Sequence, residues 1–319
     1  MDPLTEALAV RRGGGVIELA RGTIQVTGSE RLGFLDGLLT CDVKVLRPGA
    51  CAYAALLNAR GRVLADLLAY DVGEGYLLDV DASLTAKVLG ILGESRVSED
   101  VACLDRTAEF GRWSVLGPQA PRIVEAAFSI TAPVRGAWVE AGDAVVARTD
   151  ALALPGFDIL APPGLVLTDR LAAAGAVTFG EEAWEVLRLE AGRPRYGADM
   201  DEGTIALEAR LEGAISFDKG CYVGQEVVAR VVHRGHLKRY LVPLVLDSPA
   251  VPPRMSPVRR EGESVGHVTS AARSAALGRG IALAYVRAGL DEPGTALVVE
   301  TPDGTVSARV ATPPLVPLV

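Results

Sequence analysis

The densest group of chemically capable side chains in this sequence lies around Cys221. Gly220 and Gly224 let the chain beside this thiol turn sharply, and Lys219 stands near enough in sequence to stabilise a thiolate. Residues 219–239 carry five Lys or Arg against a single acidic residue, a local formal charge of +4 in a chain of −8. The pattern predicts a reactive thiol on a surface that attracts anions. The alternative is a small buried cysteine beside a solvated, charged strand face.

Glu190 is a second candidate because of its place in a predicted helix. Thr178 and Glu181 are spaced as a capping box, and the helix that they begin carries Glu190 in its last turn. A helix C-terminus disfavours negative charge. The position therefore predicts a compensating partner, which is either a bound ligand or a nearby arginine, Arg193 or Arg195.

Other familiar kinds of site are not expected. The sequence has no G-x-x-x-x-G-K-[ST], G-x-S-x-G or H-E-x-x-H motif and no G-x-G-x-x-G at a strand-to-helix turn, which argues against nucleotide hydrolysis, hydrolase and nicotinamide chemistry. Four cysteines without a C-x-x-C pair predict reduced thiols rather than disulfides or structural zinc. A permanent iron–sulfur cluster lacks the required ligand spacing, and His233 and His236 are expected to be solvated or bonded to backbone.

Length and composition predict a soluble protein of about two domains. The 319 residues are 49% hydrophobic and 23% charged, which is enough to bury a sizeable and mainly aliphatic core. A net charge of −8 argues against a protein that coats nucleic acid or an anionic membrane. Neither a secretory signal nor a membrane-spanning apolar run is visible. We therefore expect a cytoplasmic protein with no membrane partner and no direct nucleic-acid partner.

The elements that must position these candidates change character along the chain. Residues 21–130 predict short strands alternating with helices, with strands at 23–27, 53–57, 63–70, 76–80 and 113–116 and helices capped by Ser29 and Asp81. After Tyr240 the sequence becomes β-rich, and Asp303-Gly304 marks a hairpin. The order predicts an α+β region followed by a small antiparallel barrel or sandwich.

Residues 219–230 resemble the K-G-C-[FY]-x-G-Q-E-x-x-x-R signature of the YgfZ family. These are folate-binding proteins of iron–sulfur cluster assembly or repair, related to the glycine-cleavage T-protein, a folate-dependent aminomethyltransferase. The resemblance continues through residues 31–40, 57–66, 188–200 and 266–270. It implies an α+β fold with two intertwined folate-binding subdomains over 1–235, the smaller near 51–108. A C-terminal antiparallel β-barrel over 236–319 would complete the chain, with folate at the junction.

The resemblance also implies roles for individual residues. Cys221 would be a reactive thiol assisted by Lys219, within a motif that includes Gly220, Tyr222, Gly224, Gln225 and Glu226. Glu190 falls at the position of a pterin-binding glutamate, whose carboxylate suits the paired donors of a pterin. The remaining candidates for binding tetrahydrofolate or a derivative are Asp66, the aromatic residues Phe34, Tyr53 and Tyr196, and, for the glutamate tail, Arg230.

One departure from the T-protein pattern favours the YgfZ branch. Where T-proteins carry G-G-x-x-D-D, this chain has Arg62 for one glycine and Ala65 for one acid, and T-proteins lack the Cys221 motif. The leading hypothesis is thus a tetrahydrofolate-binding accessory protein, not a standalone enzyme, that transiently meets iron–sulfur client proteins. The alternatives are a folate-dependent one-carbon transferase, such as an aminomethyltransferase, and a non-catalytic docking scaffold.

Overall fold

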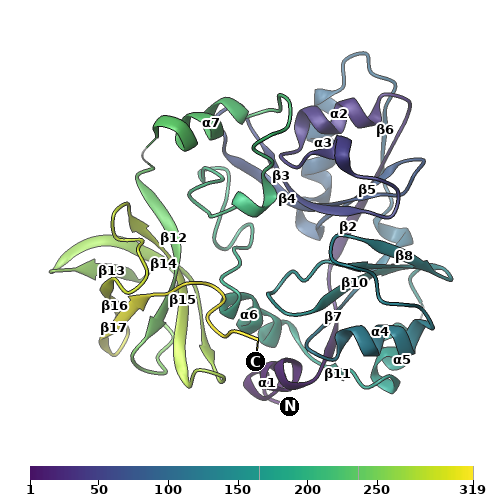
Figure 1. The fold of residues 1–319 in the computed structure, drawn as a ribbon. Helices are drawn as coiled ribbons and strands as arrows, with labels where there is room; N and C mark the ends of the chain where they lie inside the picture. Colours follow the sequence, from purple (N-terminus) through teal and green to yellow (C-terminus); the bar gives the residue numbers. More distant parts are fainter. Residues whose placement is uncertain (165, 236, 319) are drawn as a thin grey trace.

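The computed structural model describes residues 1–164, 166–235 and 237–318. Figure 1 shows three bodies: a purple-to-blue sheet with its helices, a second sheet in teal, and a green-to-yellow barrel. This arrangement confirms the expected α+β class with a C-terminal antiparallel β-barrel. No helix within the described ranges is long and apolar enough to cross a membrane.

The first sheet has five antiparallel strands in the order β3-β4-β5-β2-β6. Their bounds are β2 Arg21–Thr27, β3 Cys51–Leu57, β4 Val63–Asp71, β5 Tyr76–Asp81 and β6 Ala102–Asp105. One face packs against α2 (Arg31–Leu38), η1 (Val43–Val45) and α3 (Thr85–Ser95), which follows η2 (Ala82–Leu84). The strands contribute every second side chain to this core, as the alternating burial along β4 shows.

The second sheet has six strands in the order β11-β1-β7-β10-β9-β8, antiparallel except for the β1–β11 pair. Their bounds are β1 Gly15–Glu18, β7 Gly111–Leu116, β8 Trp138–Ala141, β9 Ala144–Arg148, β10 Gly156–Ala161 and β11 Val177–Thr178. The surrounding helices are α1 Pro3–Arg12, α4 Ala120–Phe128, α5 Leu167–Ala173 and α6 Glu181–Glu190, whereas η3 (Thr107–Glu109) contacts β2 of the first sheet.

The barrel closes in the order β12-β15-β14-β13-β16-β17, and every pair is antiparallel. Its strands are β12 Arg239–Leu246, β13 Pro257–Arg260, β14 Glu263–Ser274, β15 Arg279–Arg287, β16 Ala296–Thr301 and β17 Gly304–Val310. The hairpin turn consists of Pro302 and Asp303, one residue before the pair expected from the sequence, because Thr301 pairs with Gly304.

Helix α6 connects the second sheet with the barrel. It packs against α1 and against β14 and β15, and the two chain ends lie close together beside it (Figure 1). From its end the chain runs through η4 (Glu212–Ala214) to α7 (Gln225–Arg234) and then into the barrel. The segment between α6 and α7 thus passes the first sheet, where the Val63 amide donates to the Thr204 carbonyl at 2.9 Å and the Val63 side chain packs in one core with Met200 and Ala206.

Two helix caps differ from the expectation. Ser29 does not cap α2, since its hydroxyl donates to Asp100 at 2.6 Å and Glu30 occupies the cap position. Thr178 does not cap α6 either, because it pairs with Val16 in β11 and Gly180 takes the cap position. Asp81 does begin a helical segment, by accepting the Ser83 amide of η2, which leads into α3.

Residues 225–234 form a helix, so the alternative interpretation of a charged strand face there is wrong. The valines of this segment favour a strand locally. On the helix, however, Val228 is buried against the core around the 200–222 segment, while Glu226 and Arg230 pair at i and i+4 on the exposed side. His233 lies on the exposed surface of α7, and His236 lies outside the described residues.

Candidate functional site

A cavity of about 420 Å³ lies where the two sheets meet the start of α6. Strands β2, β3 and β4 contribute to it from the first sheet, and β7 and β10 contribute from the second. Its charged and aromatic lining residues are Arg21, Tyr53, Asp66, Asp81, Arg112, Asp158, Glu181, Trp184, Arg188, Arg193, Arg195 and Tyr196. Three of the residues expected to bind folate are therefore brought together here, namely Asp66, Tyr53 and Tyr196.

The β3–β4 hairpin builds one wall of this cavity. Tyr53 pairs with Leu68 and Ala55 pairs with Asp66, so Tyr53 and Asp66 are diagonal neighbours across the hairpin. The Tyr53 hydroxyl donates to Asp66 Oδ2 at 2.9 Å. Burial, and secondly the Asp66 charge, raises the pKa of Tyr53 well above its ordinary value. Tyr53 therefore stays a neutral phenol whose proton is committed to Asp66.

Asp66 faces the cavity, whereas the preceding residue faces the opposite way. Ala65 is fully buried in the core formed with α2 and α3, as strand alternation requires. Ala65 is the position where the resemblance implies a second carboxylate. The carboxylate that is missing at position 65 would therefore not face the cavity, and Asp66, which does, is retained.

Arg193 covers the Tyr53 ring. Its guanidinium carbon lies 4.2 Å from the ring centroid, and Nη1 donates to the Ala151 carbonyl at 3.1 Å. Within the part of the chain that the structure describes, no carboxylate lies within ion-pair distance of Arg193. Its positive charge is therefore available to a ligand.

Tyr196 forms another part of the wall and is held from behind by Lys87 of α3. The Lys87 ammonium donates to the Tyr196 hydroxyl at 2.8 Å and to the Leu64 carbonyl at 2.7 Å, and it pairs with Glu202 at 2.7 Å. Burial would lower the pKa of Lys87, but the hydrogen bonds to Glu202 and Tyr196 outweigh it and raise the pKa. Lys87 therefore remains charged.

A buried charge network forms the part of the cavity between the sheets. Arg112 reaches Asp79 at 2.7 Å and Asp158 at 3.0 Å, and it donates to the Tyr70 hydroxyl at 3.0 Å. Burial alone would lower the pKa of Arg112, but Asp158 and Asp79 outweigh it and raise the pKa. Because Asp79 is in β5 and Asp158 is in β10, this arginine ties the two sheets together beneath the ligand space.

Glu190 does not line the cavity. Its side chain is 1% exposed and is bound by the Arg11 guanidinium and by the Ser274 hydroxyl, the latter at 2.6 Å. Its backbone carbonyl accepts the Leu315 amide at 2.6 Å. The compensating partner that its helix-end position requires is thus Arg11, rather than a ligand, Arg193 or Arg195.

Lys219 is buried and fully engaged. Its ammonium pairs with Asp36 at 3.0 Å and donates to the backbone carbonyls of Asp36, Leu39 and Cys41 at 2.7–2.9 Å. Lys44 also pairs with Asp36, at 2.9 Å. Burial would raise the pKa of Asp36, but both lysines outweigh it and lower the pKa. Lys219 therefore clamps the loop after α2, which differs from its expected role beside the thiol.

Cys221 is exposed and does not line the cavity. Two of its neighbours in the motif anchor the loop: Tyr222 is buried, and Gly224 has φ +87° with its Cα so close to the Asn58 carbonyl that a Cβ would lie 2.7 Å away. Gly224 is thus required both by its backbone angle and by this close approach. The other cysteines are less available, since burial raises the pKa of Cys41 to about 11 and of Cys51 to about 12.

The remaining expected residues also lie away from the cavity. Phe34 is buried in the core of the first sheet. Gly220 is exposed, Gln225 begins α7, and Arg230 pairs with Glu226 at 2.7 Å on the surface of that helix. The structure therefore separates the cavity from the Cys221 motif instead of joining them in one site.

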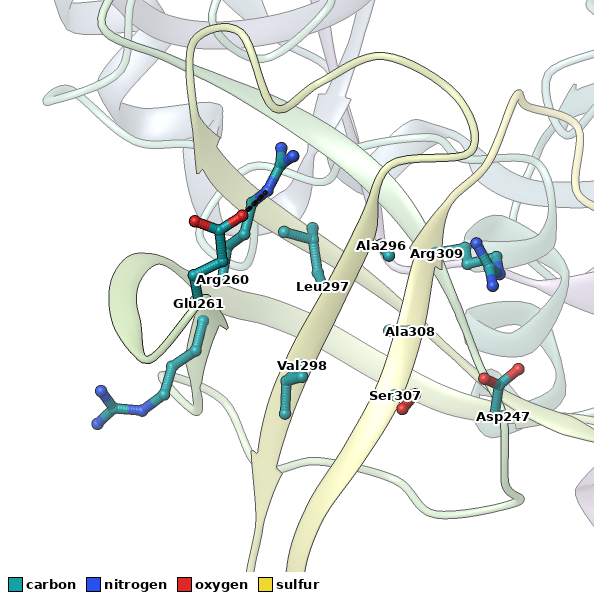
Figure 2. Close-up of a pocket in the computed structure, with 10 residues that line it drawn as sticks. Asp247, Arg260, Glu261, Ala296, Leu297, Val298, Ser307, Ala308 and Arg309 are labelled. Atoms are coloured by element: carbon teal, nitrogen blue, oxygen red, sulfur yellow. Dashed lines mark ion pairs between the residues drawn. The ribbon is translucent and has the colours of Figure 1, made fainter.

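A second hollow, of about 400 Å³, lies on the barrel (Figure 2). Figure 2 shows Leu297 and Val298 on one strand beside Ser307 and Ala308 on the next. None of the residues expected to act lines this hollow. It therefore does not serve as the candidate site.

Most of the charged lining of the cavity was not predicted from the sequence as part of a site. Trp184 of α6 was not among the candidates, and Arg193 was expected only as a partner of Glu190. Arg112 gave no signal at all, because a single arginine in a strand does not show that its strand meets another sheet. The adjacent R-P-R-Y residues 193–196 were the available hint for Arg193.

Curated relatives of this chain are aminomethyltransferases. That of Rubrobacter xylanophilus is 35% identical over 288 residues, covering 87% of this chain and 77% of the relative. That of Streptomyces avermitilis is 34% identical over 311 residues, which cover 91% of this chain and 83% of the relative. That of Bacillus subtilis is 30% identical over 322 residues, which cover 96% of this chain and 88% of the relative.

The fold agrees with this similarity. The crystal structure of the glycine cleavage system aminomethyltransferase T from Bartonella henselae superposes with a TM-score of 0.90 at 23% identity, covering 99% of this chain and 90% of that one. The family model described as the GCVT N-terminal domain matches residues 3–219, and the model described as the glycine cleavage T-protein C-terminal barrel domain matches residues 239–317. The chain therefore belongs to the glycine cleavage T-protein family.

Proposed function

We propose that the cavity binds tetrahydrofolate or a derivative of it. A volume of about 420 Å³ suits a cofactor of this size, since ligand pockets commonly span roughly 300–1,000 Å³. Tyr53 with Arg193 above it, together with Trp184 and Tyr196, offers flat surfaces for the pteridine and benzoyl rings. Arg195 is 48% exposed among the lining residues and pairs with Glu185 at 2.6 Å, so a negatively charged tail can reach its guanidinium from the solvent side.

We infer that the function is folate-dependent one-carbon transfer of the aminomethyltransferase kind. The observation that carries this is Asp66, a carboxylate at the cavity wall. When bound, tetrahydrofolate supplies the amine that accepts a one-carbon unit. Asp66 Oδ2 is occupied by the Tyr53 hydroxyl, and no protein donor in the described ranges occupies Oδ1. Oδ1 is therefore the atom that accepts the proton from that amine.

Replacing Asp66 with asparagine is expected to weaken tetrahydrofolate binding by about tenfold to hundredfold, since a hydrogen bond to a charged acceptor is worth about 1.5–3 kcal/mol. Isothermal titration calorimetry measures this directly. Asp143→Asn, an exposed aspartate outside the cavity, is the matched control and should bind as the wild type does. Equal binding by a folded Asp66→Asn variant, or no binding by the wild type, would remove the assignment.

With the wild type, an aminomethylated carrier protein and tetrahydrofolate are expected to yield methylenetetrahydrofolate, ammonia and the freed carrier protein. The rate should fall about 10²- to 10⁴-fold in Asp66→Asn, because a positioned acid–base group contributes that much. Cys221→Ser should leave the rate unchanged, since Cys221 does not line the cavity. Product formation is followed by the absorbance or mass of the folate. Absence of any product with the folate-binding wild type would contradict the transferase.

A second candidate function is supported by the exposed Cys221. A YgfZ-like accessory protein of iron–sulfur enzymes would present this thiol to a client protein and keep folate in a separate site, as the two positions are arranged here. Under this proposal Cys221→Ser would abolish the restoration of an iron–sulfur client's activity while tetrahydrofolate affinity stays unchanged. If the wild type and Cys221→Ser restore the client's activity equally, this candidate function is wrong.

A further inference from the structure

Lys87 has no unused hydrogen-bond donor. Its three ammonium hydrogens meet the Leu64 carbonyl, the Glu202 carboxylate and the Tyr196 hydroxyl, each at 2.7–2.8 Å. The ammonium also lies 4.8 Å from the centroid of the Tyr196 ring. An ammonium has no lone pair and accepts nothing, so the direction of the bond to Tyr196 is fixed: Lys87 donates and the phenol oxygen accepts.

The hydroxyl proton of Tyr196 must therefore point away from Lys87. A phenol carries one proton and two lone pairs, and Lys87 occupies a lone pair. Within residues 1–164, 166–235 and 237–318 the structure gives this proton no acceptor. Since Tyr196 lines the cavity, the proton is available to an acceptor on a bound ligand.

The two tyrosines of the cavity thus have opposite polarity. The Tyr53 hydroxyl donates its proton to Asp66, so this pair offers a ligand only the acceptor oxygens of the carboxylate. Tyr196 is turned into a donor by Lys87. A ligand that satisfies both must carry a hydrogen-bond donor and a hydrogen-bond acceptor.

We propose that Lys87 is a positioning residue that makes the Tyr196 hydroxyl a donor to the 4-oxo group of the pteridine. This inference rests on the proposed binding of tetrahydrofolate. In tetrahydrofolate the 4-oxo acceptor and the N5–H donor are neighbours across the ring fusion, which matches a Tyr196 donor working with the Asp66 acceptor. The cavity accordingly selects 4-oxo pteridines and disfavours 4-amino pteridines, whose amino group brings a second donor to Tyr196.

The test compares tetrahydrofolate with tetrahydroaminopterin, which differs by an amino group at position 4. Dissociation constants for both are measured by calorimetry with the wild type, Lys87→Met and Tyr196→Phe. The ratio of the tetrahydroaminopterin constant to the tetrahydrofolate constant is expected to fall roughly threefold to tenfold in each variant, the worth of about one hydrogen bond. The 4-amino group also changes the basicity of the ring. This effect cancels when the ratio of a variant is compared with the ratio of the wild type, because Asp66 is unchanged in all of them.

Two further variants separate positioning from a general structural effect. Glu202→Gln breaks the ion pair of an exposed glutamate but leaves the bond from Lys87 to Tyr196, so the ratio should stay at the wild-type value. In the double variant Lys87→Met/Tyr196→Phe, the ratio should equal that of Tyr196→Phe alone. An unchanged ratio in Lys87→Met, or an additive double variant, overturns the inference. If the wild type fails to bind tetrahydrofolate at all, the proposed function fails instead.

Discussion

Replacing Lys219 with methionine is expected to lower the free energy of unfolding by about 3–5 kcal/mol, the usual cost of removing one partner of a buried ion pair. The Lys219 side chain is 1% exposed, and its partner Asp36 is 4% exposed. The same ammonium supplies three backbone carbonyls, which lose their donor in the variant. Methionine fills the space but donates nothing.

Lys44 provides a matched control because it pairs with the same carboxylate from the surface. Its side chain is 59% exposed, so Lys44→Met should change the unfolding free energy very little. Urea denaturation of both variants, with the midpoint and slope compared, gives the difference. Equal stability of the two variants would mean that Lys219 is not the clamp described above.

The Lys219 clamp bears on the reactivity of Cys221. The Lys219 ammonium contacts Asp36 within α2 and the carbonyls of Leu39 and Cys41 just after it, and its charge is balanced by Asp36. To stabilise a Cys221 thiolate, the Lys219 ammonium would have to leave the Asp36 carboxylate that it already neutralises. The structural role therefore accounts for Lys219 in the motif without invoking the thiol, and Cys221 keeps its exposure as the feature that requires a functional explanation.

The hairpin wall of the cavity is the part of the site that sequence reasoning can reach. Alternation predicts the strands at 53–57 and 63–70, and they are found as β3 and β4. Two strands joined by a short turn pair in register, and this alone brings Tyr53 near Asp66. Local pattern is sufficient because the two residues are 13 positions apart.

The long-range contacts could not be predicted in this way. Asp36 and Lys219 are 183 positions apart, and Arg11 and Glu190 are 179 apart. In both cases the sequence offers a nearer partner. Arg193 is three positions from Glu190, and Cys221 is two positions from Lys219. The packing of α1 against α6 and of the motif loop against α2 decides otherwise, because a buried charge needs a partner at the place where it is buried.

Glu190 lies at a junction between the second sheet and the barrel. Its carboxylate joins Arg11 of α1 to Ser274 of β14, and Arg11 also donates to the Val316 carbonyl at 3.2 Å. The Arg11–Glu190 pair therefore joins four segments of the chain, namely α1, α6, β14 and the residues near Val316, with the barrel on one side and the second sheet on the other. Glu190→Gln is expected to cost about 3–5 kcal/mol of unfolding free energy, since it leaves the Arg11 charge buried without its counter-ion.

Calorimetry and denaturation together distinguish this latch from a pterin anchor. A latch predicts lower stability with unchanged tetrahydrofolate affinity for the folded Glu190→Gln protein, because Glu190 does not line the cavity. Arg11→Met should lower stability in the same direction, and the double variant should lose less than the sum of the single losses, because the two side chains interact directly. Additive losses would contradict the latch. A stable Glu190→Gln protein that no longer binds tetrahydrofolate would contradict the latch and return the pterin to Glu190.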